Sequence, residues 1–366
     1  MAEVLSGGGD GPVRPRRWPA VAGALAFAAV VVVQAHRVDP VPAPSPPPRP
    51  IAAPAVTSVV SVAVGARWSY ALVSVCDSQI VHECDYRVHR WEPAEPRWRP
   101  LPMHVSGRTT TGLDVTLRLT GTDRIALVHR NEVVVSSPDG GTTVHTARLR
   151  RGPPIAALPA GGILADGLCD GCDERVTVLD PATGDVRALT AQPAFQGFGL
   201  RLARAEGAVL WVAQIGPASA STAVSRDGGR SWRTVPLSRG LLQTGPVVLT
   251  GRPGGGAYLV GLRDDALRPD VRRIAGPAGS WERLTPATGP VTAYSAVVDE
   301  WGLLVGDSDG KAWRLLSDGR FLELPGVPGF LAGGPGRVLA GLPPTPGTVQ
   351  FSHDGGLTWR YERFGR

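Results

Sequence analysis

Residues Ser225–Trp232 read Ser-Arg-Asp-Gly-Gly-Arg-Ser-Trp, and residues Ser352–Trp359 repeat this pattern as Ser-His-Asp-Gly-Gly-Leu-Thr-Trp. The paired glycines accept positive φ angles, and the aspartate two positions after the serine accepts hydrogen bonds from N–H groups of a turn. Each stretch therefore predicts a hairpin turn, followed by a strand that begins with a buried tryptophan ring. Recurrence of the pattern indicates a repeat protein.

A third copy, Ser137–Val144, keeps the turn residues but has valine in place of tryptophan. The three copies resemble the Asp-box family (S-x-D-x-G-x-T/S-W), found in sialidase-like, sortilin-type and photosystem-assembly propellers. The resemblance implies that the boxes form turns between the third and fourth strands of each blade, with ligands bound on the opposite face. It implies that Asp227 and Asp354 lock their turns, with calcium binding at the turn as the alternative. The structural residues of the three boxes are Ser137, Asp139, Gly141, Ser225, Asp227, Gly229, Trp232, Ser352, Asp354, Gly356 and Trp359.

From residue 56 onward the sequence divides into seven units with a repeat of about 38 to 49 residues, each with about four short β-like runs. The predicted fold class is therefore an all-β, seven-bladed β-propeller over residues 56–366, with six or eight blades as alternatives. One apolar residue recurs in each unit and is expected to pack into a seam between blades. These residues are Trp98, Val144, Val186, Trp232, Trp281, Phe321 and Trp359.

The N-terminal region predicts export. Residues 1–17 read as a disordered cytoplasmic tail, 18–36 as a transmembrane helix or signal anchor, and 37–55 as a proline-rich linker. Arg14, Arg16 and Arg17 precede the uncharged run Ala20–Ala35, which orients the N-terminus toward the cytoplasm and the propeller outside it. The alternative is a signal peptide cleaved after Ala35, which also exports the chain.

The net charge of +6 comes from scattered arginines, with Lys311 as the lysine of the chain. A nucleic-acid surface more often has basic runs interleaved with aromatic residues. We therefore expect no nucleic-acid partner. We also expect a monomer and no cofactor, and the histidines do not have the spacing of a metal site.

The four cysteines are Cys76, Cys84, Cys169 and Cys172. An even number in an exported protein favours disulfides, and a bond between Cys76 and Cys84 would close a short loop. The Cys169-x-x-Cys172 pair is ambiguous between a tight disulfide, a redox pair and half of a zinc site. Both pairs are expected between second and third strands, on the presumed ligand face.

Two charged loops are further candidates for ligand contact on that face, with a solvated, self-paired surface as the alternative for each. The first contains Asp170, Asp173 and Glu174, and the second contains Arg263, Asp264, Asp265 and Arg268.

The catalytic pattern that the sialidase resemblance would imply is a poor match. Tyr86-Arg87-Val88-His89 is the nearest stretch to the expected Arg-Ile-Pro motif, and it has valine and histidine where isoleucine and proline belong. We therefore assign no catalytic residue. The sequence favours a membrane-anchored, extracytoplasmic binding module for a protein or glycan ligand. The alternatives are a sialidase-like glycoside hydrolase with a diverged site and an assembly factor for an exported membrane complex.

Overall fold

The computed structural model describes residues 56–65, 67–76, 83–92, 95–108, 115–119, 123–129, 132–164, 175–195, 200–215, 220–237, 247–252, 254–263, 266–284, 295–299, 301–306, 311–324, 330–333, 339–342 and 347–364. The predicted tail, anchor and linker lie outside these residues. Every regular element within them is a β-strand. In these ranges no helix has the length and apolar character needed to cross a membrane.

The strands form seven four-stranded sheets. The first holds β1 (Val56–Val64), β2 (Ser69–Cys76), β3 (Glu83–Glu92) and β4 (Glu95–Arg108), and the second holds β5 (Val115–Leu119), β6 (Ile125–His129), β7 (Val133–Ser137) and β8 (His145–Arg148). The third holds β10 (Ile163–Leu164), β11 (Thr177–Asp180), β12 (Asp185–Ala188) and β9 (Arg150–Arg151), and the fourth holds β13 (Leu200–Glu206), β14 (Val209–Ile215), β15 (Ala220–Ser225) and β16 (Arg233–Pro236).

The remaining three sheets follow in chain order. The fifth holds β17 (Val248–Arg252), β18 (Gly256–Arg263), β19 (Ala266–Ile274) and β20 (Glu282–Leu284), and the sixth holds β21 (Ser295–Asp299), β22 (Gly302–Gly306), β23 (Ala312–Leu315) and β24 (Phe321–Leu324). The seventh holds β25 (Phe330–Ala332), β26 (Leu339–Leu342), β27 (Thr348–Ser352) and β28 (Arg360–Arg363).

Burial changes across each sheet in a way that explains the sequence. Second strands such as β6 and β14 are buried on both faces, so they read as nearly continuous apolar runs, Ile-Ala-Leu-Val-His and Val-Leu-Trp-Val-Ala-Gln-Ile. Fourth strands such as β8 and β28 are largely exposed and carry charged residues. The apolar second strands therefore form the centre of the sheets, and the polar fourth strands form their outer edge.

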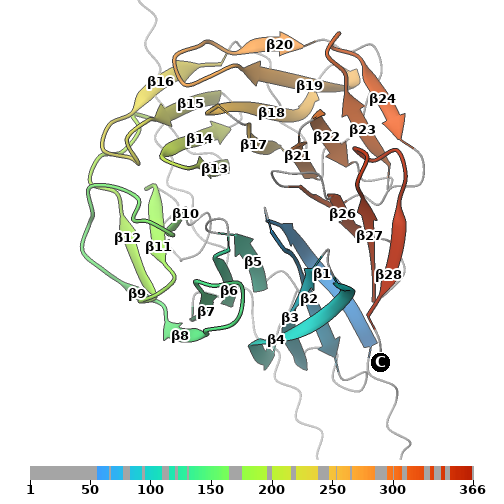
Figure 1. The fold of residues 1–366 in the computed structure, drawn as a ribbon. Coiled ribbons are helices and arrows are strands. Elements are labelled where there is room, and N and C mark those ends of the chain that lie inside the picture. Colours follow the sequence, from blue (N-terminus) through green and yellow to red (C-terminus); the bar gives the residue numbers. More distant parts are fainter. Residues whose placement is uncertain are drawn as a thin grey trace, which may run out of the picture. The chain divides into compact units, whose positions relative to one another are not determined.

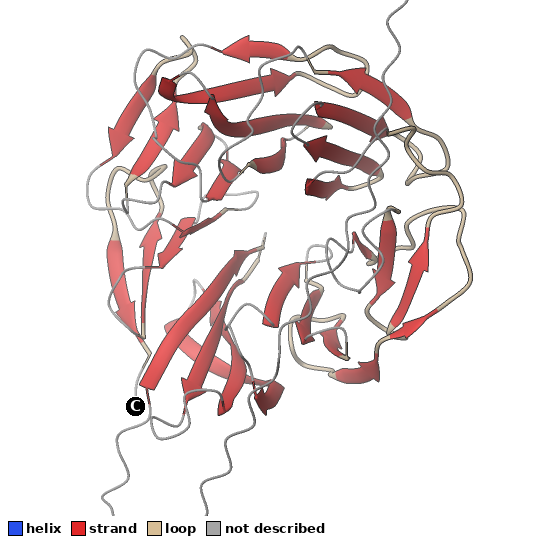
Figure 2. Cartoon of the chain, turned by 180° about the vertical axis from the view of Figure 1, so that it is seen from behind, coloured by secondary structure: helices blue, strands red, loops and turns tan. Residues whose placement is uncertain are grey.

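Hydrophobic clusters join the sheets into a ring. Seven clusters of buried side chains each contain residues of two consecutive sheets, and one of them joins the seventh sheet to the first. Figure 1 shows the sheets following one another around this ring, and Figure 2 shows it from behind. The predicted all-β propeller is confirmed at this level.

Side-chain packing closes the ring, because the first and seventh sheets share no strand. Trp91 stacks on Phe351 with ring centroids 5.1 Å apart, and Trp98 lies 5.4 Å from Phe351 and 5.0 Å from Phe364. His89 meets Phe364 edge-on at 5.1 Å. An aromatic cluster therefore joins the first sheet to the seventh.

The prediction of one seam residue per unit is confirmed. Each recurring apolar residue lies in the cluster that joins its sheet to the preceding one, with Trp98 facing the seventh sheet across the closure. The residues are Trp98, Val144, Val186, Trp232, Trp281, Phe321 and Trp359.

In the third unit the sequence predicts that the turn at Asp180–Gly184 joins the last two strands of the sheet, and this prediction is wrong. The hairpin around Asp180–Gly184 joins β11 to β12, the second and third strands in the sheet, so Val186 lies on the third strand. The fourth position is taken by β9, which comes earlier in the chain and runs parallel to β12. Because this segment follows directly from β8, the third sheet has no hairpin between third and fourth strands.

Candidate functional site

The three repeats form turns with one hydrogen-bond pattern, and we call Ser137–Thr143, Ser225–Ser231 and Ser352–Thr358 the serine–aspartate turns. In the second, the Ser225 hydroxyl donates to Asp227 Oδ1 at 2.7 Å and accepts from the Gly229 N–H at 2.7 Å. Asp227 also accepts from the Ser231 N–H at 3.0 Å and from the Ser231 hydroxyl at 2.6 Å. The other two turns repeat all four bonds. Both oxygens of each carboxylate are thus used within its own turn.

The second glycine of each turn packs against a leucine of the preceding sheet. Gly229 has a φ of 98°, and a Cβ there would lie 2.4 Å from Leu189 Cδ1. The corresponding distances are 2.4 Å from Gly141 to Leu101 and 2.6 Å from Gly356 to Leu324. Both the left-handed backbone and the close approach therefore require glycine.

The first glycine of each turn is held by a donor from the preceding sheet. The Gly140 carbonyl accepts from Arg90 Nη1 at 2.9 Å, and the Gly355 carbonyl accepts from Arg314 Nη2. At the third sheet, whose outer edge is irregular, the Leu158 N–H donates to the Gly228 carbonyl at 2.7 Å. The turns therefore connect neighbouring sheets as well as ending their own hairpins.

The hydrogen bonds also set the charge of the turns. The N–H of Thr143, followed by its hydroxyl, lowers the pKa of Asp139 from 3.8 to about 2, and the Ser231 hydroxyl lowers the pKa of Asp227. Because the folded pKa lies below the unfolded value, the stabilisation is present above about pH 3.8 and is lost as the pH falls toward 2. These carboxylates are anions across the physiological range.

We expect Thr143→Ala to raise the pKa of Asp139 part of the way toward 3.8, because it removes the hydroxyl donor and leaves the backbone N–H. Carboxyl-carbon NMR titration of the full chain measures this shift. Thr142→Ala is the matched control, because the Thr142 hydroxyl donates to the Asp139 carbonyl oxygen and not to the carboxylate. An Asp139 pKa of 3.8 in the native protein would contradict the role of the turn.

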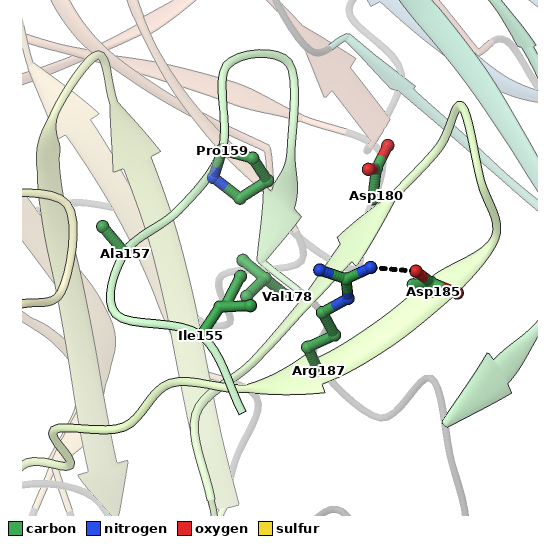
Figure 3. A pocket seen from close by; sticks show the side chains of 7 residues that line it. All are labelled: Ile155, Ala157, Pro159, Val178, Asp180, Asp185 and Arg187. Carbon is green, nitrogen blue, oxygen red and sulfur yellow. Dashed lines mark hydrogen bonds and ion pairs between the residues drawn. The ribbon is translucent and has the colours of Figure 1, made fainter. Parts of the chain in front are cut away.

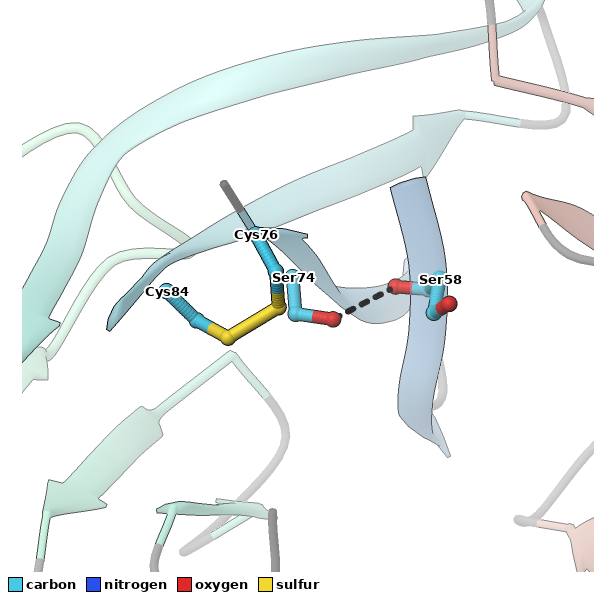
Figure 4. The surroundings of a disulfide bond; sticks show 4 residues. All are labelled: Ser58, Ser74, Cys76 and Cys84. Atoms are coloured by element: carbon cyan, nitrogen blue, oxygen red, sulfur yellow. Dashed lines mark hydrogen bonds between the residues drawn. A yellow bond between two sulfur atoms is a disulfide. The ribbon is translucent and has the colours of Figure 1, made fainter. Parts of the chain in front are cut away.

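The end of the ring opposite the serine–aspartate turns carries the disulfide. Cys76 and Cys84 face each other directly on β2 and β3 and are joined by an S–S bond of 2.06 Å (Figure 4). Beside them, the Ser74 hydroxyl donates to the Ser58 carbonyl at 3.4 Å. The predicted Cys76–Cys84 disulfide is confirmed, and its placement between second and third strands is also correct. Val56 pairs with Cys76, so the chain enters the ring at this end.

The predicted ligand-face residues fall in two different places. Arg263 ends β18 and Arg268 lies in β19, the second and third strands of the fifth sheet, while Asp264 and Asp265 lie outside the described residues. Cys169, Cys172, Asp170, Asp173 and Glu174 also lie outside them. Their segment connects β10 to β11, the first and second strands of the third sheet, so the predicted position between second and third strands is wrong.

Sequence reasoning missed the buried charges. Asp299 and Arg314 form a two-bond ion pair with side chains 0% and 6% exposed, and Asp270 and Arg272 pair at 0% and 1% exposure. No feature of the sequence around these four residues distinguishes them from charged residues at the surface. One sequence signal could have indicated such residues. In the first and sixth sheets, a tryptophan between the first two strands is combined with an arginine on the third strand, as Trp68 with Arg90 and Trp301 with Arg314. The unequal lengths of the loops between them obscure this repeat.

Metal ligation has no candidate in the described ranges, where no three His, Cys, Asp or Glu side chains come together to hold an ion. Searches against protein-family models and curated proteins find no match.

Solved structures with a similar fold share little sequence. YCF48 from Cyanidioschyzon merolae is 12% identical over 85% of this chain and 86% of that chain, with a TM-score of 0.36. A prolyl endopeptidase is 13% identical over 84% of this chain and 50% of that one, with a TM-score of 0.48. An α-L-arabinanase from Penicillium chrysogenum, complexed with arabinobiose, is 13% identical over 84% and 98%, with a TM-score of 0.38. The β-propeller assignment therefore rests on the chain's own sheets and seams.

Proposed function

We propose that the chain is an Asp-box propeller, each of whose seven four-stranded sheets is one blade, and that it binds a protein or glycan outside the cytoplasm. One observation carries the proposal. The serine–aspartate turns lie at one end of the ring with their carboxylates committed to turn hydrogen bonds. Contacts with a ligand are therefore left to the opposite end.

That opposite end has the features of a binding surface. Two long connections between sheets, residues 237–247 and 285–294, leave the fourth strands β16 and β20 toward that end. Binding residues on rigid scaffolds commonly lie on such connections, and propellers present them around one rim. The loop between Arg263 and Arg268 belongs to the same end and supplies charges of both signs for polar contacts.

The Cys76–Cys84 disulfide supports the extracytoplasmic location, because such bonds persist in oxidising compartments. We propose that residues 18–36 anchor the chain and that residues 37–55 hold the propeller away from the membrane. The bond would then form only after export. Proteins bearing a C169S/C172S double substitution, trapped with a thiol reagent in intact cells, should show no free thiol until a reductant is added.

The end that binds can be tested by site-specific photo-cross-linking in the full chain. A cross-linker at Glu132, on the β6–β7 connection opposite the turns, is expected to capture the partner. The matched control is a cross-linker at Arg230, an exposed residue of a serine–aspartate turn, which is expected to capture none. Equal capture at both positions, or capture at Arg230 alone, would overturn the assignment of the binding end.

An activity assay on the full chain distinguishes a binding protein from a glycoside hydrolase. Incubation with fluorogenic glycosides, including a sialoside, should release no fluorophore if the chain only binds. Release that is lost on substituting a carboxylate of the binding end would establish the hydrolase instead.

A further inference from the structure

The irregular outer edge of the third sheet borders a partly open cavity. After β9 the chain leaves the sheet and returns at Ile155, which pairs with Leu189. Between this segment and the sheet lies a space of about 140 Å³ (Figure 3). Its lining consists of Ile155, Ala157, Pro159, Val178, Asp180, Asp185 and Arg187.

The strand register places all the charged lining residues on one face. Val178 pairs with Arg187, and Asp180 pairs with Asp185, so these four side chains project from the same side of β11 and β12. Asp180 and Arg187 are diagonal neighbours, which in antiparallel pairs lie about 7–8 Å apart. The segment through Ile155, Ala157 and Pro159 forms an apolar wall beside them (Figure 3).

The charges on this face are only partly used. The Asp185 side chain, 8% exposed, binds both Arg150 Nε at 2.5 Å and Arg187 Nη2. Arg187 Nε is buried and has no hydrogen-bond partner in the described part of the chain. Asp180 accepts the Ala182 N–H at 3.0 Å, and no arginine or lysine among the described residues pairs with its carboxylate. The pocket is therefore lined by the Arg187 guanidinium and the Asp180 carboxylate, opposite charges that do not pair with each other in the described part of the chain.

We propose that this cavity binds a small zwitterion, a free α-amino acid with a short apolar side chain. The ligand carboxylate accepts from Arg187, the ammonium donates to Asp180, and the side chain packs on Ile155, Pro159 and Val178. A cavity of about 150 Å³ accepts a molecule as large as benzene, so a ligand of about the size of valine fits this one. Two opposite charges on one ligand match the two opposite charges of the site, whereas a simple amine or acid matches only one of them.

Isothermal titration calorimetry of the purified full chain with L-valine, isobutylamine and isovalerate tests this proposal. Isobutylamine lacks the carboxylate and isovalerate lacks the ammonium. We expect valine to bind and each analogue to bind at least about tenfold more weakly, because each loses a charge-assisted hydrogen bond. Absence of binding by valine, or binding of isovalerate as tight as that of valine, would refute the proposal.

The Asp180→Asn variant tests whether the ammonium group of the ligand binds the Asp180 carboxylate. Asparagine keeps the Oδ1 that accepts from Ala182 and removes the charge, so the turn should remain folded. Valine affinity should fall by about tenfold while isovalerate affinity stays unchanged. Asp318→Asn is the matched control and should not alter either affinity, because Asp318 lies outside the cavity and its Oδ1 likewise accepts the N–H two residues on, from Arg320 at 3.0 Å. Unchanged valine binding by Asp180→Asn would place the ligand elsewhere.

Discussion

Phe351→Ala is expected to lower the free energy of unfolding by about 3–5 kcal/mol, the range for truncating a large buried aromatic side chain. Phe351 is 2% exposed and contacts both Trp91 and Trp98 across the closure. Since the first and seventh sheets share no strand, this packing holds the ring closed. Urea denaturation of the full chain, followed by tryptophan fluorescence, measures the change.

Tyr361→Ala is the matched control for the closure. Tyr361 lies on β28 of the same sheet, but it is 64% exposed, so truncation should change the stability by no more than about 0.5 kcal/mol. If Phe351→Ala cost as little as Tyr361→Ala, the aromatic cluster would not be what closes the ring.

The turns and their tryptophans could be predicted from sequence because their interactions are local. The hydrogen bonds that define the second turn join Ser225, Asp227 and Gly229, which lie within five residues of one another. The local sequence pattern is therefore sufficient to predict the structure of the turn. The recurring apolar residues follow from the same regularity, because each unit must bury one face against the unit before it.

The closure and the third sheet could not be predicted, for different reasons. Trp91 and Phe351 are far apart in the sequence and come into contact because the ring closes. The sequence around either residue does not indicate that the other is its partner. The Asp180–Gly184 hairpin looks like any turn between two strands, and only the pairing of β9 with β12 shows that it joins second and third strands. The cavity follows from that unexpected pairing, so it was equally hidden.

The buried ion pairs were hidden by composition. In a chain with 38 basic residues, Arg314 has no local feature that separates it from exposed arginines. Its burial depends on the neighbouring sheet, because Arg314 donates to the Gly355 carbonyl of the following serine–aspartate turn. Asp299 is held within its own sheet, where it accepts from the Trp301 N–H at 2.9 Å while it binds the guanidinium.

Asp299→Ala is expected to destabilise the protein by about 3–5 kcal/mol, because it leaves the Arg314 guanidinium buried without a counter-charge. The carboxylate now binds Arg314 Nη1 at 2.5 Å and Nη2 at 2.9 Å, with side chains 0% and 6% exposed. Asp318→Ala is the matched control: its partner Arg320 is 75% exposed, so the loss should not exceed about 1 kcal/mol. Urea denaturation measures both variants.

A double variant separates the net contribution of the ion pair to stability from the destabilisation caused by leaving one charge unpaired. Asp299→Leu with Arg314→Met replaces both charges by apolar groups of similar size and should recover most of the stability lost in Asp299→Ala, since apolar replacement of a buried pair is often neutral. The recovery should be incomplete, because methionine cannot donate to the Gly355 carbonyl that Arg314 holds. A double variant no more stable than Asp299→Ala would show that the contact between the sixth sheet and the serine–aspartate turn, and not the unpaired charge, accounts for the loss.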